Sequence, residues 1–209
     1  ISVYYAGITI IKSNECKLIG FTAIRVDDIL AGGDMVTINK LLNGLESKYN
    51  KIEVQKGNTL QYLGMKLERN RENNIKSIFI SQPGYTDEII RTMIPPVEKV
   101  YETPYTSDIL MIHSENNQQN KLNDKDKKFF RSQLMKLLFL TRSRADIKFP
   151  TIMLTTKIEE PTNNDMVHLQ RIVGYLSGTS KLGITLKPNN YQLSCEADAS
   201  FGIHKDGKG

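Results

Sequence analysis

The sequence predicts an α+β fold in which β-hairpins precede a group of helices. Residues 17–30 and 60–81 contain short runs rich in apolar and β-branched residues and bounded by turn residues, which is typical of hairpins. After residues 34, 83, 124 and 164, apolar residues recur at intervals of three, four and seven, the period of an amphipathic helix. Two further strands are predicted after the last helix, at 183–187 and 191–198.

The first hairpin spans residues 17–30 and carries Asp27 and Asp28 near its turn. A pair of glycines ends its second strand, and Asp34 then caps a helix because its carboxylate can accept a hydrogen bond from the first turn. One face of this helix is apolar, and we expect it to pack in the core. That face consists of Met35, Ile38, Leu41, Leu42, Leu45 and Tyr49.

A second hairpin is predicted from strands 60–68 and 75–81, joined across residues 70–74. Pro83 suits the first position of a helix, which ends before a pair of prolines. Residues 102–123 are polar and lack periodicity, and they are predicted to form an exposed connector. The residues expected to be buried by the helix are Tyr85, Ile89, Ile90 and Met93.

The second half of the chain is predicted to be mainly helical. One helix begins at Asp124 and continues to about Thr141, and a second follows Asp146. A third spans residues 164–177, with Gly178 at its C-terminal end. The inward-facing residues are Phe130, Leu134, Leu137 and Leu138 in the first of these helices, and Met166, Leu169, Val173 and Leu176 in the third.

Composition excludes several classes of protein. The 209 residues are 39% hydrophobic and 24% charged, which suits one large or two small globular domains. No apolar run approaches the roughly 18 residues of a membrane span, so we expect no membrane partner. Cys16 and Cys195 lack CxxC spacing and the histidines lack ligand spacing, which excludes structural zinc and predicts reduced thiols. The chain begins with neither methionine nor a signal peptide, and we expect it to be an internal piece of a longer polypeptide.

Asp27 and Asp28 are the first candidate functional residues. Adjacent carboxylates within an apolar segment repel one another and lose hydration, and a divalent cation would offset both effects. The alternative is a solvated turn without a ligand, because most Asp-Asp pairs have no metal-binding role. The pair alone does not decide between these alternatives.

Positive charge is the second candidate feature, because it is confined to one segment. Residues 121–157 contain ten lysines and arginines and three aspartates, so this segment carries a net charge of +7 within a chain of net charge +5. A surface that binds phosphates would have this appearance. A solvated helix face is the alternative, and it remains open here.

Eight sequence blocks, in order, resemble the reverse transcriptase region of copia-type LTR retrotransposon polyproteins. The first, Lys17–Gly20 through Val26–Leu30, resembles the family's catalytic Tyr-Val-Asp-Asp hairpin. The later blocks are Leu60–Met65, Ile80–Tyr85, Thr103–Pro104, Phe130–Ser132 with Leu138–Arg142, Arg144–Ile147, His168 with Arg171–Thr179, and Ala197–Gly202. The resemblance covers nearly the whole chain.

The resemblance implies a partial polymerase palm at 1–100, a connector at 101–123, a helical thumb or connection at 124–180, and the truncated opening strands of a ribonuclease H-like domain at 181–209. Asp27 and Asp28 would bind Mg²⁺, or Mn²⁺, for nucleotidyl transfer by two metal ions. Asp198 matches the first catalytic carboxylate of ribonuclease H. The residues that would contact template–primer phosphates are Lys127, Lys128, Arg131, Lys136, Arg142 and Arg144.

The implied partners are an RNA template, a DNA primer, deoxynucleotide triphosphates and the rest of the polyprotein. The implied location is intracellular, in the cytoplasm, a virus-like particle or the nucleus. The chain departs from the family pattern at three places: Arg25 replaces the tyrosine before Val-Asp-Asp, Ala145 replaces a proline, and residues 133–136 lack an expected glycine. The family's upstream catalytic aspartate has no counterpart before Lys17, so we expect a fragment of an RNA-directed DNA polymerase that is inactive alone.

Two alternatives belong to other functional classes. A non-catalytic nucleic-acid-binding module of retroelement descent would account for the +7 segment and for Arg25 beside the acidic pair. A nucleotide cyclase of the Gly-Gly-Asp-Glu-Phe kind is suggested by Gly32, Gly33 and Asp34. Met35 and Val36 follow in place of Glu-Phe and no second block matches, which disfavours the cyclase.

Overall fold

The computed structural model describes residues 6–12, 18–25, 28–72, 75–111 and 120–187. The chain divides into two compact units, Ile1–Glu68 and Arg69–Gly209. Both units contain antiparallel strands and helices, so the predicted α+β class is confirmed. None of the described helices is long and apolar enough to cross a lipid bilayer.

An antiparallel sheet of order β1-β2-β3 forms the centre of the first unit. Its strands are β1 (Ala6–Lys12), β2 (Leu18–Arg25) and β3 (Asp28–Gly33). The β2–β3 pair confirms the predicted hairpin, with Gly20 opposite Gly33 at one end and Arg25 opposite Asp28 at the other. The β1 strand was not predicted, and it pairs with β2 from Ala6 opposite Arg25 onward.

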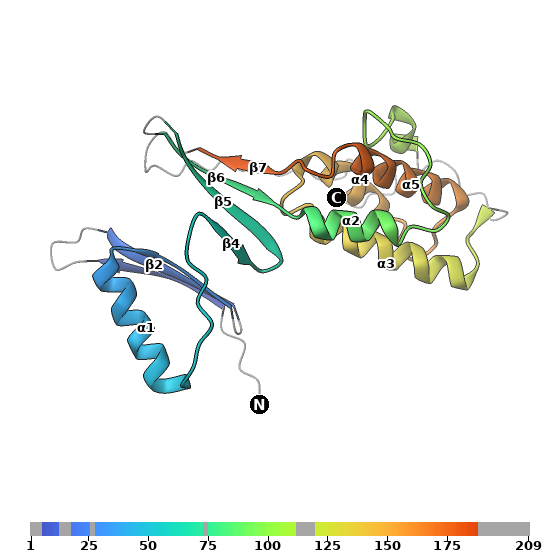
Figure 1. The fold of residues 1–209 in the computed structure, drawn as a ribbon. Helices are drawn as coiled ribbons and strands as arrows, with labels where there is room; N and C mark the ends of the chain where they lie inside the picture. The colour runs from blue at the N-terminus through green and yellow to red at the C-terminus, as the bar shows by residue number, and fades with distance from the viewer. Residues whose placement is uncertain (1–5, 13–17, 26–27, 73–74, 112–119, 188–209) are drawn as a thin grey trace, which may run out of the picture. The chain divides into compact units, whose positions relative to one another are not determined.

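Helix α1 (Met35–Tyr49) follows the sheet and lies beside it (Figure 1). The predicted cap is confirmed, because the Asp34 carboxylate accepts a hydrogen bond from the Thr37 amide at 2.9 Å. The expectation that the apolar face packs in the core is confirmed only in part, because Ile38, Leu41, Leu42 and Leu45 are half-buried. No residue of α1 is buried, and Met35 and Tyr49 are 64% and 59% exposed.

The predicted strand 60–68 is two strands rather than one. β4 (Thr59–Tyr62) turns back at Leu63 and Gly64 and pairs with the start of β5 (Met65–Glu72). Both turn residues have positive φ, 51° and 74°, the conformation of a two-residue type I′ hairpin turn. Leucine is an unusual residue for this conformation, so turn composition did not reveal the turn.

The second unit combines strands with a helical bundle (Figure 1). β6 (Ile75–Ser81) pairs with β7 (Ile184–Leu186), and the second sheet has the order β4-β5-β6-β7. Its helices are α2 (Pro83–Arg91), α3 (Asp124–Leu140), α4 (Lys148–Thr155) and α5 (Asn163–Gly178), with short 3₁₀ turns η1 (Ser107–Met111) and η3 (Ala145–Ile147). The four predicted segments remain predictions, and the strand predicted at 191–198 lies outside the described residues.

The helices of the second unit confirm the predicted elements closely. Pro83 begins α2, and Gly178 is the last residue of α5. The cap of α3 is Asn123, whose side chain accepts from the Asp126 amide at 3.0 Å, so Asp124 is the first helical residue. The fully buried hydrophobic residues include Ile89, Met93, Phe130, Leu134, Leu137, Leu169, Val173 and Leu176, whereas the predicted core residues Tyr85, Ile90, Leu138 and Met166 are half-buried.

The predicted exposed connector is partly wrong. Within 102–123, η1 packs Ile109 into the core with 1% of its surface exposed. Residues 112–119 lie outside the described part. An isolated apolar residue carries no periodicity, which explains why the sequence pattern did not indicate this contact.

The segment before η1 crosses α5 at very close range. The Tyr101 amide donates to the Gly174 carbonyl at 3.4 Å. A Cβ atom at Gly174 would lie 2.5 Å from the Lys99 carbonyl oxygen and 2.7 Å from the Tyr101 ring. Since backbone cannot yield as a flexible side chain does, this approach requires glycine.

Gly174→Ala should therefore lower the free energy of unfolding by about 1–3 kcal/mol through overpacking. Gly84 in α2 is the matched control, because no atom lies within 4 Å of a Cβ there. Gly84→Ala should be neutral or stabilising by up to about 1 kcal/mol, from helix propensity alone. Urea unfolding followed by circular dichroism measures both, and equal changes in the two variants would contradict the close-approach argument.

Candidate functional site

Asp28 is the candidate carboxylate whose position the structure describes. It is the first residue of β3, is exposed, and lies directly opposite Arg25, the last residue of β2. Asp27 and Asp198 lie outside the described residues, so their predicted roles remain predictions.

Asp28 and Arg25 lie on the face of the sheet turned away from α1. A Cβ at Gly20 would point at the Thr37 side chain of α1, which identifies the covered face. Strand residues alternate between faces, so Arg25, five positions after Gly20, is on the other face. Phe21 is also on that face, where its ring lies 2.5 Å from the Cβ position of Gly32 and is 40% exposed.

A hydrogen bond ties the second hairpin of the first unit to this sheet. The Tyr62 hydroxyl donates to the Ala23 carbonyl at 3.2 Å. Tyr62 is the last residue before the tight turn at Leu63 and Gly64, so the turn end of β4–β5 is held beside β2. The strand that leads into the aspartate pair is therefore supported from two sides, by α1 and by Tyr62.

The described residues do not by themselves complete a magnesium site. Mg²⁺ takes several oxygen ligands at close to octahedral geometry. Within the described ranges no three histidine, cysteine, aspartate or glutamate side chains gather in one place. Asp28 offers one carboxylate, and a cationic side chain stands opposite it.

Lys127, Lys128 and Arg131 lie on the first half of α3. Lys128 is exposed, and the described part of the chain gives it no ion pair. Arg131 is exposed, and its Nε donates to the Ile158 carbonyl at 2.8 Å. Lys127 is half-buried near Glu160, whose pKa is lowered chiefly by a hydrogen bond from Lys121 and further by the Lys127 charge. Lys128 and Arg131 are thus exposed and Lys127 is half-buried, and phosphate contact by these three residues remains a prediction.

Lys136 and Arg142 have partners of their own. The Lys136 ammonium lies 3.2 Å from the Glu88 carboxylate and 3.3 Å from the Thr92 hydroxyl, joining α3 to α2. Arg142 is exposed, with its guanidinium 4.5 Å from the centre of the Phe139 ring. Lys136 thus links α3 to α2, whereas Arg142 remains accessible to solvent.

Arg144 belongs to the interior and not to a binding surface. Only 1% of it is exposed, and its guanidinium donates to both Asp146 carboxylate oxygens at 2.7–3.2 Å. It also donates to the Thr179 carbonyl and hydroxyl, each at 2.8 Å. A guanidinium with these contacts cannot face phosphate, and we exclude Arg144 from the predicted nucleic-acid contacts.

The Arg144 network joins two segments that lie far apart in the sequence, Arg144–Ile147 and Arg171–Thr179. Tyr175 on α5 donates its hydroxyl to Asp146 at 2.8 Å, and Thr179 follows the end of that helix. Asp146, Tyr175 and Thr179 had no predicted role, because partners 29 and 35 residues apart cannot be paired from sequence spacing. The sequence feature that could have indicated this network is the Arg-x-Asp spacing of Arg144 and Asp146, together with the later pair Gly178 and Thr179.

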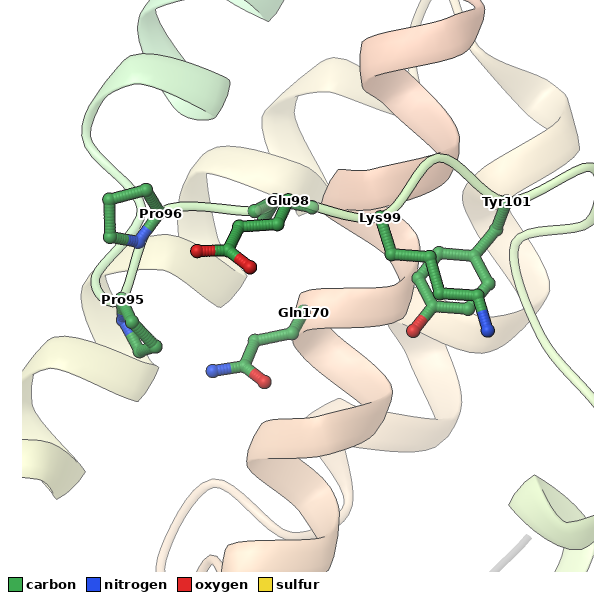
Figure 2. Close-up of a pocket in the computed structure, with 7 residues that line it drawn as sticks. Pro95, Pro96, Glu98, Lys99, Tyr101 and Gln170 are labelled. Carbon is green, nitrogen blue, oxygen red and sulfur yellow. The ribbon is translucent and has the colours of Figure 1, made fainter.

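A shallow pocket of ≈ 340 Å³ lies between the segment after α2 and the side of α5 (Figure 2). Glu98 and the Gln170 amide point toward its centre, and the prolines and Lys99 stand at opposite ends. This mixture of groups shows no arrangement typical of catalysis. The lining residues are Pro95, Pro96, Val97, Glu98, Lys99, Tyr101 and Gln170.

The Asp146 interactions predict a pH dependence of stability. Burial raises the pKa of Asp146, but hydrogen bonds from Arg144 and Tyr175 outweigh it, so the net pKa lies below the ordinary value. Because the folded pKa is depressed, the contribution is complete above the unfolded pKa of about 3.9 and is lost as pH falls through the folded pKa.

Asp146→Asn should lower the free energy of unfolding at pH 7 by about 2–3 kcal/mol, because it leaves the buried Arg144 charge uncompensated. This free-energy cost is small for the loss of one partner of a buried ion pair, because the Asp146 side chain is 33% exposed. Glu68→Gln, in the exposed pair with Lys66, is the control and should cost about 0.5 kcal/mol or less. Unfolding curves at pH 7 and pH 3.5 provide the measurement, and equal costs for the two variants would contradict the network's role.

Comparisons with known proteins place the chain among retroelement sequences. It is 26% identical over 182 residues to an uncharacterized mitochondrial protein of Arabidopsis thaliana, a match that covers 85% of the chain and 71% of that protein. It is 30% identical to the retrovirus-related Pol polyproteins from transposons RE2 and RE1 of the same plant, over 89% and 91% of the chain.

The chain spans 12% of the length of each of these two polyproteins. No family model matches the chain, and no solved structure matches it. Over most of its length, the chain is related to one segment of retrotransposon Pol polyproteins.

Proposed function

We propose that the chain is a segment of the RNA-directed DNA polymerase region of a copia-type retrotransposon Pol polyprotein. The observation that carries the proposal is the 30% identity to two such Pol polyproteins over about nine tenths of the chain. The β2–β3 hairpin supports it, because Asp28 is exposed at the turn end of two paired strands. The ordered motif blocks account for the assignment to the reverse transcriptase region.

In this proposal Asp27 and Asp28 contribute carboxylates to a Mg²⁺ or Mn²⁺ site of the intact polymerase. The metal ions would supply charge stabilisation for nucleotidyl transfer between a DNA primer and a deoxynucleotide triphosphate on an RNA template. Asp198 would belong to an adjoining ribonuclease H domain. The setting would be intracellular, in the cytoplasm, a virus-like particle or the nucleus.

The segment is expected to act as part of the polyprotein. The described residues provide Asp28 without two further ligands beside it, and in this proposal the family's upstream catalytic aspartate completes the metal site. The chain corresponds to 12% of the length of each Pol polyprotein, which agrees with a segment that acts within a longer protein. We therefore expect templated synthesis from the intact polyprotein and none from the 209 residues alone.

Asp28→Asn, introduced into the intact polyprotein, should lower primer extension on an RNA template by at least about 100-fold, because loss of a metal ligand exceeds the 10–100-fold cost of losing an outer-shell partner. Asp87→Asn, at an exposed position of α2, is the matched control and should leave extension unchanged. Incorporation of labelled nucleotide measures both. Full activity of the Asp28→Asn variant would remove the polymerase assignment.

A non-catalytic nucleic-acid-binding module is the second candidate. The observation in its favour is the basic surface on the first half of α3, formed by Lys127, Lys128 and Arg131. Arg142, beyond the C-terminal end of α3, is a further exposed cation, with its guanidinium over the Phe139 ring. Such a module would bind template–primer through phosphates, without metal ions and without synthesis.

Binding of the chain to an RNA–DNA duplex should weaken with salt, and Lys128→Gln and Arg131→Gln should each reduce the slope of log K against log salt by about 0.9. Lys51→Gln in the exposed segment after α1 removes the same charge elsewhere and serves as the control. Fluorescence anisotropy at four salt concentrations gives the slopes. Unchanged slopes in both α3 variants would exclude this surface as the binding site.

A further inference from the structure

The loop that joins α4 to α5, residues 156–162, is fastened to α3 and to the segment just before it. The Leu122 amide, two residues before the helix, donates to the Pro161 carbonyl at 2.9 Å. From within α3, the Arg131 Nε donates to the Ile158 carbonyl at 2.8 Å. The loop therefore lies against the half of α3 that carries the basic surface.

Glu160 brings a carboxylate from this loop to the basic segment. Its Oε2 lies 3.0 Å from the Lys121 Nζ, and its side chain is 69% exposed. The hydrogen bond from Lys121 and the Lys121 charge lower the pKa of Glu160, and the Lys127 charge lowers it further. At neutral pH the carboxylate is therefore ionised, and it interacts with two lysines of the segment.

The loop offers these cations the kind of acceptor that a nucleic-acid backbone would offer. Lysine and arginine contact a phosphate through its oxygen atoms. Here the Glu160 carboxylate pairs with Lys121, and the Ile158 carbonyl takes one of the N–H groups of Arg131. Because an exposed ion pair contributes little to stability, a phosphate with a higher charge density can displace the carboxylate.

We propose that Glu160 is an internal competitor of nucleic-acid phosphate, which pairs with Lys121 until a phosphate displaces it and thereby lowers the affinity of the α3 surface. The inference rests on the second candidate function, in which Lys127, Lys128 and Arg131 bind template–primer phosphates. Lys121 then adds to binding only after Glu160 has been displaced. The loop thus regulates the same surface that it lies against.

The alternative is that the ion pair only fastens the loop. The hydrogen bonds from Leu122 and Arg131 already hold the loop through its backbone carbonyls. Glu160→Gln keeps a side-chain oxygen that can accept from Lys121 and removes only the charge. This substitution should therefore leave the loop in place, which circular dichroism and urea unfolding can verify.

Binding of the full 209-residue chain to an RNA–DNA duplex, followed by fluorescence anisotropy at four salt concentrations, tests the proposal. Glu160→Gln should tighten the dissociation constant by about 5-fold at low salt, because one exposed negative charge beside the phosphates is removed. It should also steepen the slope of log K against log salt by about 0.9, because Lys121 gains a phosphate. Adding Lys121→Gln to this variant should remove the extra slope.

Glu159→Gln is the matched control. It changes the same charge on the same exposed loop, and Glu159 makes no hydrogen bond or ion pair within the part of the chain that the structure describes. It should leave the salt slope unchanged. Equal tightening and equal slopes in the Glu159→Gln and Glu160→Gln variants would overturn the proposal, because pairing with Lys121 would not be the cause.

Two further outcomes separate failure of this inference from failure of the surface itself. If Lys128→Gln and Arg131→Gln reduce the slope while Glu160→Gln binds as the parent chain does, the surface stands and the role of Glu160 is overturned. If the two α3 variants change nothing, or the parent chain does not bind the duplex, the surface is overturned and the inference with it.

Discussion

The buried guanidinium of Arg144 is the interaction on which the second unit depends. It is 1% exposed, so its charge is compatible with the fold only while Asp146 neutralises it and Thr179 satisfies its other donors. Those partners come from the turn after α3 and from the end of α5, and Tyr175 adds a hydrogen bond from within α5. One side chain therefore links the end of α5 to the turn after α3.

The two units differ in how they are stabilised. The second has a dry core in which residues such as Phe130, Leu134 and Leu169 are fully buried. Among the residues of the first unit whose burial is described, no hydrophobic side chain is fully buried, and α1 has no buried residue. Its stability must come mainly from strand pairing, helix capping at Asp34 and half-buried contacts. The candidate carboxylate Asp28 thus lies in the unit with less packing, where local opening costs less free energy.

Sequence patterning predicted the elements that local physics determines. The helices beginning at Met35, Pro83 and Asp124 have clear starting residues and an apolar period, and all three were predicted within a residue or two. The turn at Leu63 was missed because leucine seldom adopts positive φ, and tertiary contacts rather than local preference hold it there. Arg144 was assigned to a basic surface because a count of charges cannot show that a partner lies 35 residues away. The aspartate hairpin was predicted, but its register, which sets Arg25 opposite Asp28, required the structure.

Arginine stands near aspartate at two places in the described residues, and the two places differ in burial. Arg144 and Asp146 lie in a region where removing one partner strands a buried charge, so their pairing is a condition of folding. Arg25 and Asp28 are exposed, where such a pair contributes about 0.2–1 kcal/mol to stability. The fold therefore places little constraint on the residue opposite Asp28, and that position is free to vary with the chemistry of the turn. The same residue types thus fulfil a requirement of folding in the interior of the second unit, whereas at the exposed end of the β2–β3 hairpin they do not.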